Sequence, residues 1–497
     1  MIKRIGGALL LSLKIDRSAA ETVGNQLYTA MRDFIHAGGL HLGERLPASR
    51  TLAQDIKVSR TTVINVFERL ISEGLVESRT GAGTFVSDVW RSTRPTPPEA
   101  STAEVVKQTP GKPRLSRTYT RASAAFVDRL PHQSRAFTTA LPAFDAFPRA
   151  LWAQLMTKHW RSPDEISMGH VDPCGYPPLR QAIASHLLSN RGIKCESEQV
   201  FIVSGAQQAF QLIGTLLLDP NENVWFENPG AIGARNSLIA YGARLIPVPV
   251  DQDGLVVERG LQQAPAFRLA FVTPSHQQPL GVSMSLNRRY ALLQAAEDAN
   301  AFIIEDDYDG EFRYSGQPPP TLKSIDNLGR VIYVGTFSKT LFPALRLGFL
   351  LAPPQLVEVF NHVSKALLQG VPSSHQGVVA DFMQEGHFAT HIRRMRKTYA
   401  ERHQVLCDAA HRHLTGLLDI VPTNTGLHTI GRLSANISET AVASAALKRG
   451  IVVTPIERFS IVPTDTRGLV LGFSGIKPPK IIAGVKVLAE VLEKLHR

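Results

Sequence analysis

Residues 335–346 read Gly-Thr-Phe-Ser-Lys-Thr-Leu-Phe-Pro-Ala-Leu-Arg, and this stretch says most about how the chain folds. It continues the apolar run Val331 to Val334, which predicts a short buried strand. Another apolar run, Phe302 to Ile304, leads into the acidic segment Glu305-Asp306-Asp307-Tyr308-Asp309, whose Asp306 lies 33 residues before Lys339. The two segments together supply an amine, a carboxylate, a phenol and a guanidinium.

These four groups match the needs of pyridoxal phosphate, which proteins bind through a lysine Schiff base and a carboxylate on the ring nitrogen. Lys339 is the candidate for the Schiff base, and Asp306 is the candidate for the pyridinium nitrogen. Tyr308 would hydrogen-bond the ring oxygen, and Arg346 would bind the phosphate bidentately. Each residue alone also fits a structural role, such as a surface lysine or a strand-end cap, so the prediction rests on their joint order.

Other parts of the chain add candidate contacts to the same cofactor. An apolar strand meets a helix at Ser204-Gly205-Ala206-Gln207, where free N–H groups and the helix dipole favour a phosphate. The Thr336 hydroxyl is a further candidate. His276 lies in a loop that we expect to face the cofactor, but it fits a hydrogen-bonded structural histidine equally well.

Composition limits the classes of function. The chain has 497 residues, enough for two or three domains, and its 54 basic and 43 acidic residues favour an anionic partner. Cys174, Cys195 and Cys407 show no metal-ligand spacing, so no metal site is predicted, and a reducing cytoplasm is the simplest setting. No uncharged run is long enough to span a bilayer, so we expect no membrane partner.

The segment 12–88 has the pattern of a winged helix-turn-helix. Apolar residues at helical spacing predict a helix from Ala19 to His36, and Ser49 is the expected N-cap of a helix through Ile56. Ser59 would cap a helix from Arg60 to Glu73. Two short strands then flank the glycine-rich tip at residues 80–83, which predicts a hairpin.

The first turn of the second helix of such a motif meets base edges in the major groove, so double-stranded operator DNA is the expected partner. Arginine there can bind guanine bidentately, and hydroxyls suit phosphates or bases. Glycine at the wing tip lets the backbone come close to a DNA phosphate or to the minor groove. The candidate DNA-binding residues are Arg50, Ser59, Arg60, Thr61, Thr62 and Gly81.

Residues 89–130 are rich in Pro, Thr, Ser and Arg, which predicts an extended, flexible linker. Its bases outnumber its acids, and the sequence favours solubility and extra phosphate contacts equally. From residue 131 to 497, short apolar runs alternate with helical stretches, which indicates a largely parallel sheet covered on both faces. The last hundred residues indicate a smaller α+β subdomain.

Several motifs resemble known families. The runs Gly43–Arg50, Val58–Val63 and Gly74–Val86 resemble the GntR class of bacterial regulators, in which a residue matching Arg50 also reaches DNA. The runs Asp172–Arg180, Thr273–Gln277 and Glu305–Tyr314, with Lys339, resemble fold-type I aminotransferases. The whole chain resembles the MocR family, which joins both parts. This resemblance implies a head-to-tail homodimer and a small-molecule effector, either pyridoxal phosphate or an amine or amino acid, that changes DNA binding.

The chain departs from the resembled families at positions that bear on ligand binding. Ala231 replaces an aromatic residue that stacks on the cofactor, and Gly233 and Val470 replace arginines that bind an amino-acid carboxylate. The tyrosine that reaches the partner's phosphate aligns with Val171 or His170. Arg235, Arg458 and Arg467 are the candidates to substitute for the missing clamps.

The missing clamps matter because an aminotransferase must hold its substrate's carboxylate to orient the reacting bond. The sequence leaves turnover open, including residual transamination. It favours a sensor without physiological turnover over an active aminotransferase with an accessory DNA-binding domain. A third possibility, a domain that has lost its cofactor and only dimerises, conflicts with the retained Lys339 and Asp306.

Overall fold

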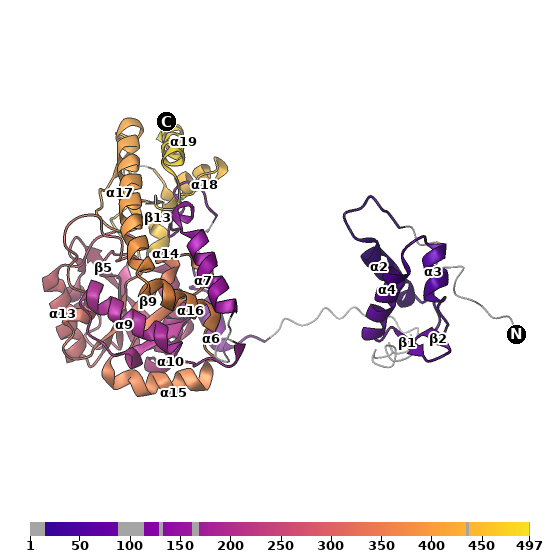
Figure 1. Ribbon diagram of the computed structural model, residues 1–497. Helices are drawn as coiled ribbons and strands as arrows, with labels where there is room; N and C mark the ends of the chain where they lie inside the picture. Colours follow the sequence, from indigo (N-terminus) through magenta and orange to yellow (C-terminus); the bar gives the residue numbers. More distant parts are fainter. Residues whose placement is uncertain (1–14, 88–113, 129–132, 162–167, 434–436, 497) are drawn as a thin grey trace, which may run out of the picture. The chain divides into compact units, whose positions relative to one another are not determined.

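Contacts divide the chain into two units, Met1–Lys112 and Pro113–Arg497 (Figure 1). The structure is a computed structural model and describes residues 15–87, 114–128, 133–161, 168–433 and 437–496. Among these residues, no helix combines the length and the apolar character that crossing a membrane requires.

The N-terminal unit is the winged helix-turn-helix that the sequence predicts. Its described elements are α2 (Val23–His36), α3 (Ser49–Asp55), α4 (Arg60–Ser72), β1 (Val76–Arg79) and β2 (Gly83–Val86). The two strands form an antiparallel hairpin in which Val76 lies opposite Val86. Leu27, Met31, Leu52, Val63 and Leu70 are at most 1% exposed and form the centre of one apolar core, so the helical spacing of these residues sets the packing.

Two predicted helix starts need correction. The first helix begins at Val23 rather than Ala19, because the Thr22 side chain caps it by accepting from Asn25 N. Ser49 is the first residue of α3 and not its N-cap, because the Ala48 carbonyl accepts the first helical bond, from Leu52 N at 2.9 Å. Ser59 is confirmed as the cap of α4, since its Oγ accepts from Thr62 N at 3.0 Å.

An eight-stranded sheet organises the C-terminal unit. Neighbouring strands follow the order β3-β10-β9-β8-β7-β4-β5-β6, and the central pairs from β9 to β5 are parallel. Their bounds are β3 Val200–Val203, β4 Asn223–Asn228, β5 Arg244–Asp251, β6 Gly254–Leu255, β7 Leu269–Val272, β8 Phe302–Asp306, β9 Val331–Thr336 and β10 Gly348–Leu351. The largely parallel sheet is therefore confirmed.

Helices cover both faces of this sheet, as the near-continuous apolar strands require. Alternation along β4 shows the two faces: Phe226 belongs to one buried cluster and Trp225 to another. The first cluster includes residues of α10 (Ala206–Leu217), α11 (Ile232–Ala240) and α15 (Val357–Leu367). The opposite face packs on α9 (Pro177–Arg191), α12 (Val257–Gln263), α13 (Leu286–Asp298) and α16 (Ser373–Gln384).

The predicted smaller α+β subdomain is also present. Its antiparallel sheet has the order β11 (Leu418–Ile420), β12 (His428–Leu433), β14 (Gly468–Gly472) and β13 (Thr454–Pro455). The helices α18 (Glu439–Lys448) and α19 (Pro478–His496) belong to it, and α19 packs along the long helix α17 (His387–His413). The helix α7 (Arg149–Arg161) packs on α16.

The segment expected to be a linker contains structure near its end. Residues 88–113 and 129–130 lie outside the described residues, but α6 (Arg117–Ser123) is helical and contacts α11. Ser116 caps α6 by accepting from Tyr119 N, and no proline interrupts it. Farther on, Asn236 of α11 bonds both backbone groups of Val127. This part of the segment is therefore not extended, because the capped helix α6 packs on α11.

Candidate functional site

A cavity of about 220 Å³ lies where several strands of the large sheet end. Asp306 is the last residue of β8 and Thr336 the last of β9, while Gly205 follows β3; all three line the cavity. Lys339 and Arg346 line it as well. The parallel arrangement of these strands explains why residues more than a hundred positions apart meet at one edge.

Lys339 lies in the single helical turn α14 (Phe337–Thr340), directly after β9. Its Nζ donates a hydrogen bond to Ala140 O at 2.9 Å. Burial lowers the pKa of Lys339 to about 8, although the carboxylates of Asp309 and Asp306 act in the opposite direction. The neutral, nucleophilic amine is therefore a minor form near neutral pH and becomes the main form above about pH 8.

Asp306 is 7% exposed, and its Oδ1 has no hydrogen-bond partner among the described residues. Burial, with Asp307 and Asp309 nearby, raises the pKa of Asp306 to about 8. A buried carboxyl oxygen without a partner is costly, so this position fits a ligand that brings its own N–H donor.

Arg346 and the start of α10 form an anion site on the cavity wall. Arg346 adopts the left-handed conformation, with φ of 51°, after the short turn Pro343–Leu345. A Cβ added to Gly205 would lie 3.8 Å from the guanidinium, so the bare backbone there leaves the arginine close to the helix start. No acidic group within the described ranges pairs with Arg346. A free guanidinium beside a helix N-terminus suits a phosphate.

Some of the other predicted cofactor contacts line the cavity and others lie outside it. Ala206, Gln207, Thr336 and Tyr308 line the cavity, whereas Ser204 and His276 do not. The backbone N–H and the hydroxyl of Ser204 both bond Gln208 Oε1, at 2.7 and 3.1 Å, so they serve the helix start. His276 lies behind Tyr308, with its Nδ1 3.2 Å from the phenol oxygen.

The positions without carboxylate clamps have structural explanations. Ala231 and Gly233 line the cavity, and a Cβ at Gly233 would lie 2.5 Å from Gln207 Nε2. The Gln207 side chain therefore occupies the space that a larger residue at position 233 would need. Val470 is 1% exposed and belongs to an apolar cluster with Ile232 and Phe459. An arginine at position 470 would have to enter that cluster.

The three candidate substitute arginines bond elsewhere. Arg235 donates to Ser460 O, Arg458 to Asp128 O and Arg467 to Ile437 O. None of them lines the cavity. Among the described lining residues, the cations are Lys339 and Arg346 alone.

Several lining residues were absent from the predicted cofactor site, among them Gln278, Phe459 and Ala140. Gln278 immediately follows the quoted run that ends at Gln277, so extending that motif by one residue would have included it. Phe459 comes from the smaller subdomain, and its carbonyl accepts from Gly230 N at 3.0 Å. The carbonyl of Ala140 accepts from Lys339. Neither Phe459 nor Ala140 has a local signal, because each reaches the cavity only through packing.

The candidate DNA-binding residues lie on the helices and the wing as expected. Arg50, Arg60 and Thr61 are exposed. The hydroxyls of Ser59 and Thr62 hydrogen-bond each other at 2.7 Å, so both also serve the cap of α4. Gly81 has φ of 73° at the exposed hairpin tip, a conformation that favours glycine.

Comparison with known proteins agrees with both parts of the chain. Residues 24–86 match the family of bacterial regulatory proteins called the gntR family. The chain is 40% identical over 476 residues to the probable rhizopine catabolism regulatory protein MocR of Rhizobium meliloti, covering 96% of this chain and 95% of that protein. The chain belongs to the MocR-type regulators. The predicted family is therefore confirmed.

The C-terminal unit of this MocR-type regulator has the fold of aminotransferases. It is similar to Pyrococcus horikoshii kynurenine aminotransferase, solved with PMP, at 26% identity and a TM-score of 0.67, covering 77% of this chain and 95% of that one. It is also similar to the α-aminoadipate aminotransferase LysN of Thermus thermophilus, solved with N-(5'-phosphopyridoxyl)-L-leucine, at 25% identity and a TM-score of 0.70, covering 77% and 99%. The chain is thus a GntR-type winged helix joined to an aminotransferase-like domain.

Proposed function

We propose that this MocR-type regulator binds pyridoxal phosphate at the cavity and that the loaded domain senses pyridoxal phosphate itself, an amine or an amino acid. The observation that carries the proposal is the set of unsatisfied groups around one cavity. Among the described residues, a buried Asp306 oxygen has no hydrogen-bond partner and Arg346 pairs with no acid, while burial lowers the pKa of Lys339. These groups fit a pyridinium, a phosphate and an aldehyde, respectively. The PMP and phosphopyridoxyl ligands of the similar aminotransferases support the same assignment.

Each residue would have a separate task. Lys339 would hold the cofactor covalently, Asp306 would accept from its ring N–H, and Arg346 with the start of α10 would bind its phosphate. When bound, pyridoxal phosphate would supply an electrophilic carbon, bonded to the Lys339 nitrogen, on which an incoming amine can replace that lysine, which leaves as a free amine. The chain's own contribution is to orient that exchange and to limit which amines enter.

The DNA side of the proposal rests on the N-terminal unit. Arg60 and Thr61 would read bases at the start of α4, with Arg50, Ser59, Thr62 and Gly81 contacting the backbone or nearby bases. As the MocR resemblance implies, we propose a head-to-tail homodimer on double-stranded operator DNA. We propose the bacterial cytoplasm as the location. Effector binding would change operator affinity as a coupling free energy between the two sites.

The rate at which Lys339 captures the cofactor should depend on pH in a specific range. Burial lowers the pKa of Lys339 to about 8, so the neutral amine is scarce below this pH and dominant above it. We expect the capture rate to rise with pH up to about 8 and then level off. Stopped-flow absorbance at a series of pH values measures this. A rate that keeps rising through pH 10 would show an ordinary, solvated lysine.

The cavity should prefer amines that lack a carboxylate. Its described cations are Lys339 and Arg346, and we assign both to the cofactor. We therefore expect ethanolamine to change the spectrum of the loaded protein at a concentration at least ~10-fold lower than L-serine, since a buried carboxylate without a cation costs more than ~1.4 kcal/mol. The pair differs only by the carboxylate. Equal potency of the two compounds would contradict this preference.

One experiment tests the proposed function as a whole. The visible spectrum of purified full-length protein is recorded with pyridoxal phosphate before and after borohydride, and operator binding is then followed while amines are added. We expect a visible band, its chemical fixation by borohydride, and a change in operator affinity with at least one ligand. Efficient transamination of a common α-amino acid would instead favour the alternative, an active aminotransferase with an accessory DNA-binding domain.

A further inference from the structure

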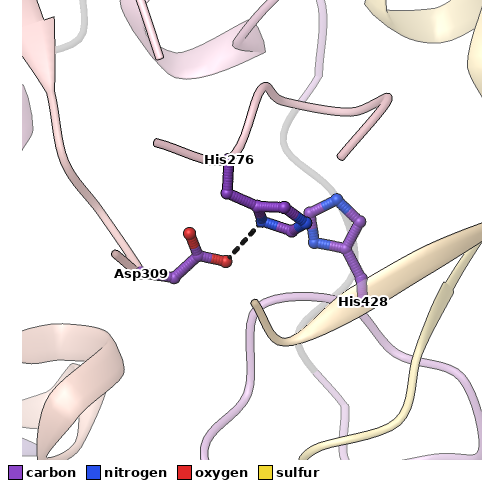
Figure 2. A group of neighbouring side chains, drawn as sticks. All are labelled: His276, Asp309 and His428. Carbon is purple, nitrogen blue, oxygen red and sulfur yellow. Dashed lines mark hydrogen bonds and ion pairs between the residues drawn. The ribbon is translucent and has the colours of Figure 1, made fainter. Parts of the chain in front are cut away.

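A buried chain of hydrogen bonds lies directly behind the cavity wall. Asp309 Oδ2 is 2.8 Å from His276 Nδ1, and the same Nδ1 is 3.2 Å from the Tyr308 hydroxyl (Figure 2 shows the first of these contacts). His276 and Asp309 are each 1% exposed, while Tyr308 forms part of the cavity wall. Neither His276 nor Asp309 touches the cavity itself.

The donor and acceptor roles in this chain follow from the chemistry of its groups. An ionised carboxylate can only accept, so the hydrogen of this contact belongs to His276 Nδ1. That N–H also faces the Tyr308 oxygen, which therefore acts as an acceptor on this side. The phenol hydrogen is then free to point away from His276. The opposite assignment, in which Tyr308 donates to His276, would need an unprotonated Nδ1 facing a carboxylate.

His428 closes the other side of the His276 ring. Its Nε2 donates to Pro279 O at 3.1 Å, and the two imidazole rings lie 4.8 Å apart at 47°. Burial, with His276 nearby, lowers the pKa of His428 to about 4, so this ring is neutral. Figure 2 shows Asp309 and His428 on opposite sides of His276, so His428 does not compete for the carboxylate.

The three side chains are also types that bind metal ions, and their ligand atoms lie within 4.8 Å of one another. Asp309 Oδ2 and His276 Nδ1, however, are already hydrogen-bonded to each other, so neither atom is available as a metal ligand in this arrangement. A carboxylate that bonds one nitrogen of an imidazole orients the ring and fixes its tautomer. The arrangement therefore favours an orienting role over shared ligation.

Two glycines hold the His276 ring in this orientation. A Cβ added to Gly426, which has φ of 84°, would lie 2.1 Å from His276 Cε1. A Cβ added to Gly281 would lie 3.1 Å from Nε2. Backbone thus lies close to the Nδ1, Cε1 and Nε2 atoms of the ring, which leaves the ring little room to turn.

We propose that Asp309 and His276 are positioning residues that hold the Tyr308 hydroxyl as a hydrogen-bond donor toward the cavity. The proposal rests on the proposed function, because the acceptor would be the ring oxygen of bound pyridoxal phosphate. A donor there stabilises the ionised form of that oxygen. It therefore lowers the pH midpoint at which the visible spectrum of the Lys339-linked cofactor changes.

Several titratable groups face this site and act on the same midpoint. Those that surround Tyr308, His276 and Lys339 from the neighbouring elements are Glu227, Asp306, Asp307, Asp309, Lys339 and His428. The negative charges of the carboxylates raise the midpoint, whereas the hydrogen bond from Tyr308 lowers it. Removing the negative charge of Asp309 would by itself destabilise the protonated, cationic form of the linkage and lower the midpoint.

The test compares the spectral midpoint of the parent, Tyr308→Phe, Asp309→Asn and the double variant. In Asp309→Asn the amide can donate to Nδ1 and reverse the tautomer, so that Tyr308 turns its hydrogen toward His276. We expect Tyr308→Phe to raise the midpoint by about one pH unit. Asp309→Asn should raise it by less, because the lost negative charge acts in the opposite direction, and it should give no rise in the Tyr308→Phe background. His403→Gln, at another buried histidine, should leave the midpoint unchanged.

Other outcomes decide against the proposal. A fall or no change in the midpoint of Asp309→Asn would overturn it, as would equal rises in both backgrounds. If Asp309→Asn does not fold, as judged by thermal unfolding, His276→Gln provides the same comparison in both backgrounds. A parent protein that shows no cofactor band would overturn the proposed function, and this inference with it, whereas a normal band with an unmoved midpoint would overturn this inference alone.

Discussion

Replacing Lys339 by alanine is expected to abolish covalent attachment of pyridoxal phosphate. Lys339 is the one lysine among the described lining residues of the cavity, and its low pKa supplies the neutral amine that an aldehyde needs. The variant should show no borohydride-fixed cofactor by mass spectrometry. Non-covalent binding through Asp306 and Arg346 should remain, at an affinity lower by at least ~10-fold. Effector-dependent changes in operator affinity should disappear.

Two controls separate covalent attachment from charge and folding. Lys339→Arg keeps a cation at the cavity but offers no amine that can form the bond, so it should behave like Lys339→Ala. Lys365→Ala removes an exposed lysine of α15 and should leave the spectrum unchanged. Borohydride fixation of the cofactor in Lys339→Ala would mean that another lysine is modified and that the assignment of Lys339 is wrong.

Replacing Arg60 by alanine is expected to remove discrimination between operator and unrelated DNA. Arg60 is exposed at the first position of α4, where the Ser59 cap fixes the direction of the helix start. A bidentate contact from arginine to guanine contributes about 1–3 kcal/mol of discrimination. The ratio of specific to non-specific affinity should therefore fall roughly 5- to 150-fold. Fluorescence anisotropy with operator and scrambled duplexes at fixed salt measures this ratio.

The matched control for Arg60 is Arg32→Ala, which removes the same charge from α2 in the same unit. It should lower the affinity for both duplexes to a similar extent, because loss of a distant cation weakens only the general attraction to phosphate. If Arg60→Ala keeps its full preference for the operator, α4 does not read bases through this residue.

The cavity bears on whether the domain works as an enzyme. A transaminase must fix the carboxylate of its substrate, and the positions that would supply a clamp are filled otherwise. Val470 lies in an apolar cluster, Gly233 leaves space for Gln207, and Arg235 bonds a backbone carbonyl. Each explanation is local and physical. Together they support the proposal of a domain that senses an amine rather than transaminating it.

Much of this structure was predictable because its signals are local. The winged helix-turn-helix follows from helical spacing, the Ser59 cap and the glycine-rich wing. The strands that end at Asp306 and Thr336 are short apolar runs bounded by polar residues, and such runs suit a parallel sheet. Helix starts were less certain, as Ser49 shows, since neighbouring residues can each provide the first accepting carbonyl.

The sequence by itself determined the two kinds of domain and the residues that we propose hold a cofactor, because strand and helix patterns and short polar motifs lie within a few consecutive positions. Only the tertiary structure decided which of those residues meet at one cavity. In the structure, Ser204 hydrogen-bonds Gln208 at the start of α10 and His276 lies behind Tyr308, while Phe459 and Ala140 line the cavity. The physical reason is that a cavity is bounded by elements remote in sequence, whose side chains are aimed by packing and by buried hydrogen bonds that no local pattern records.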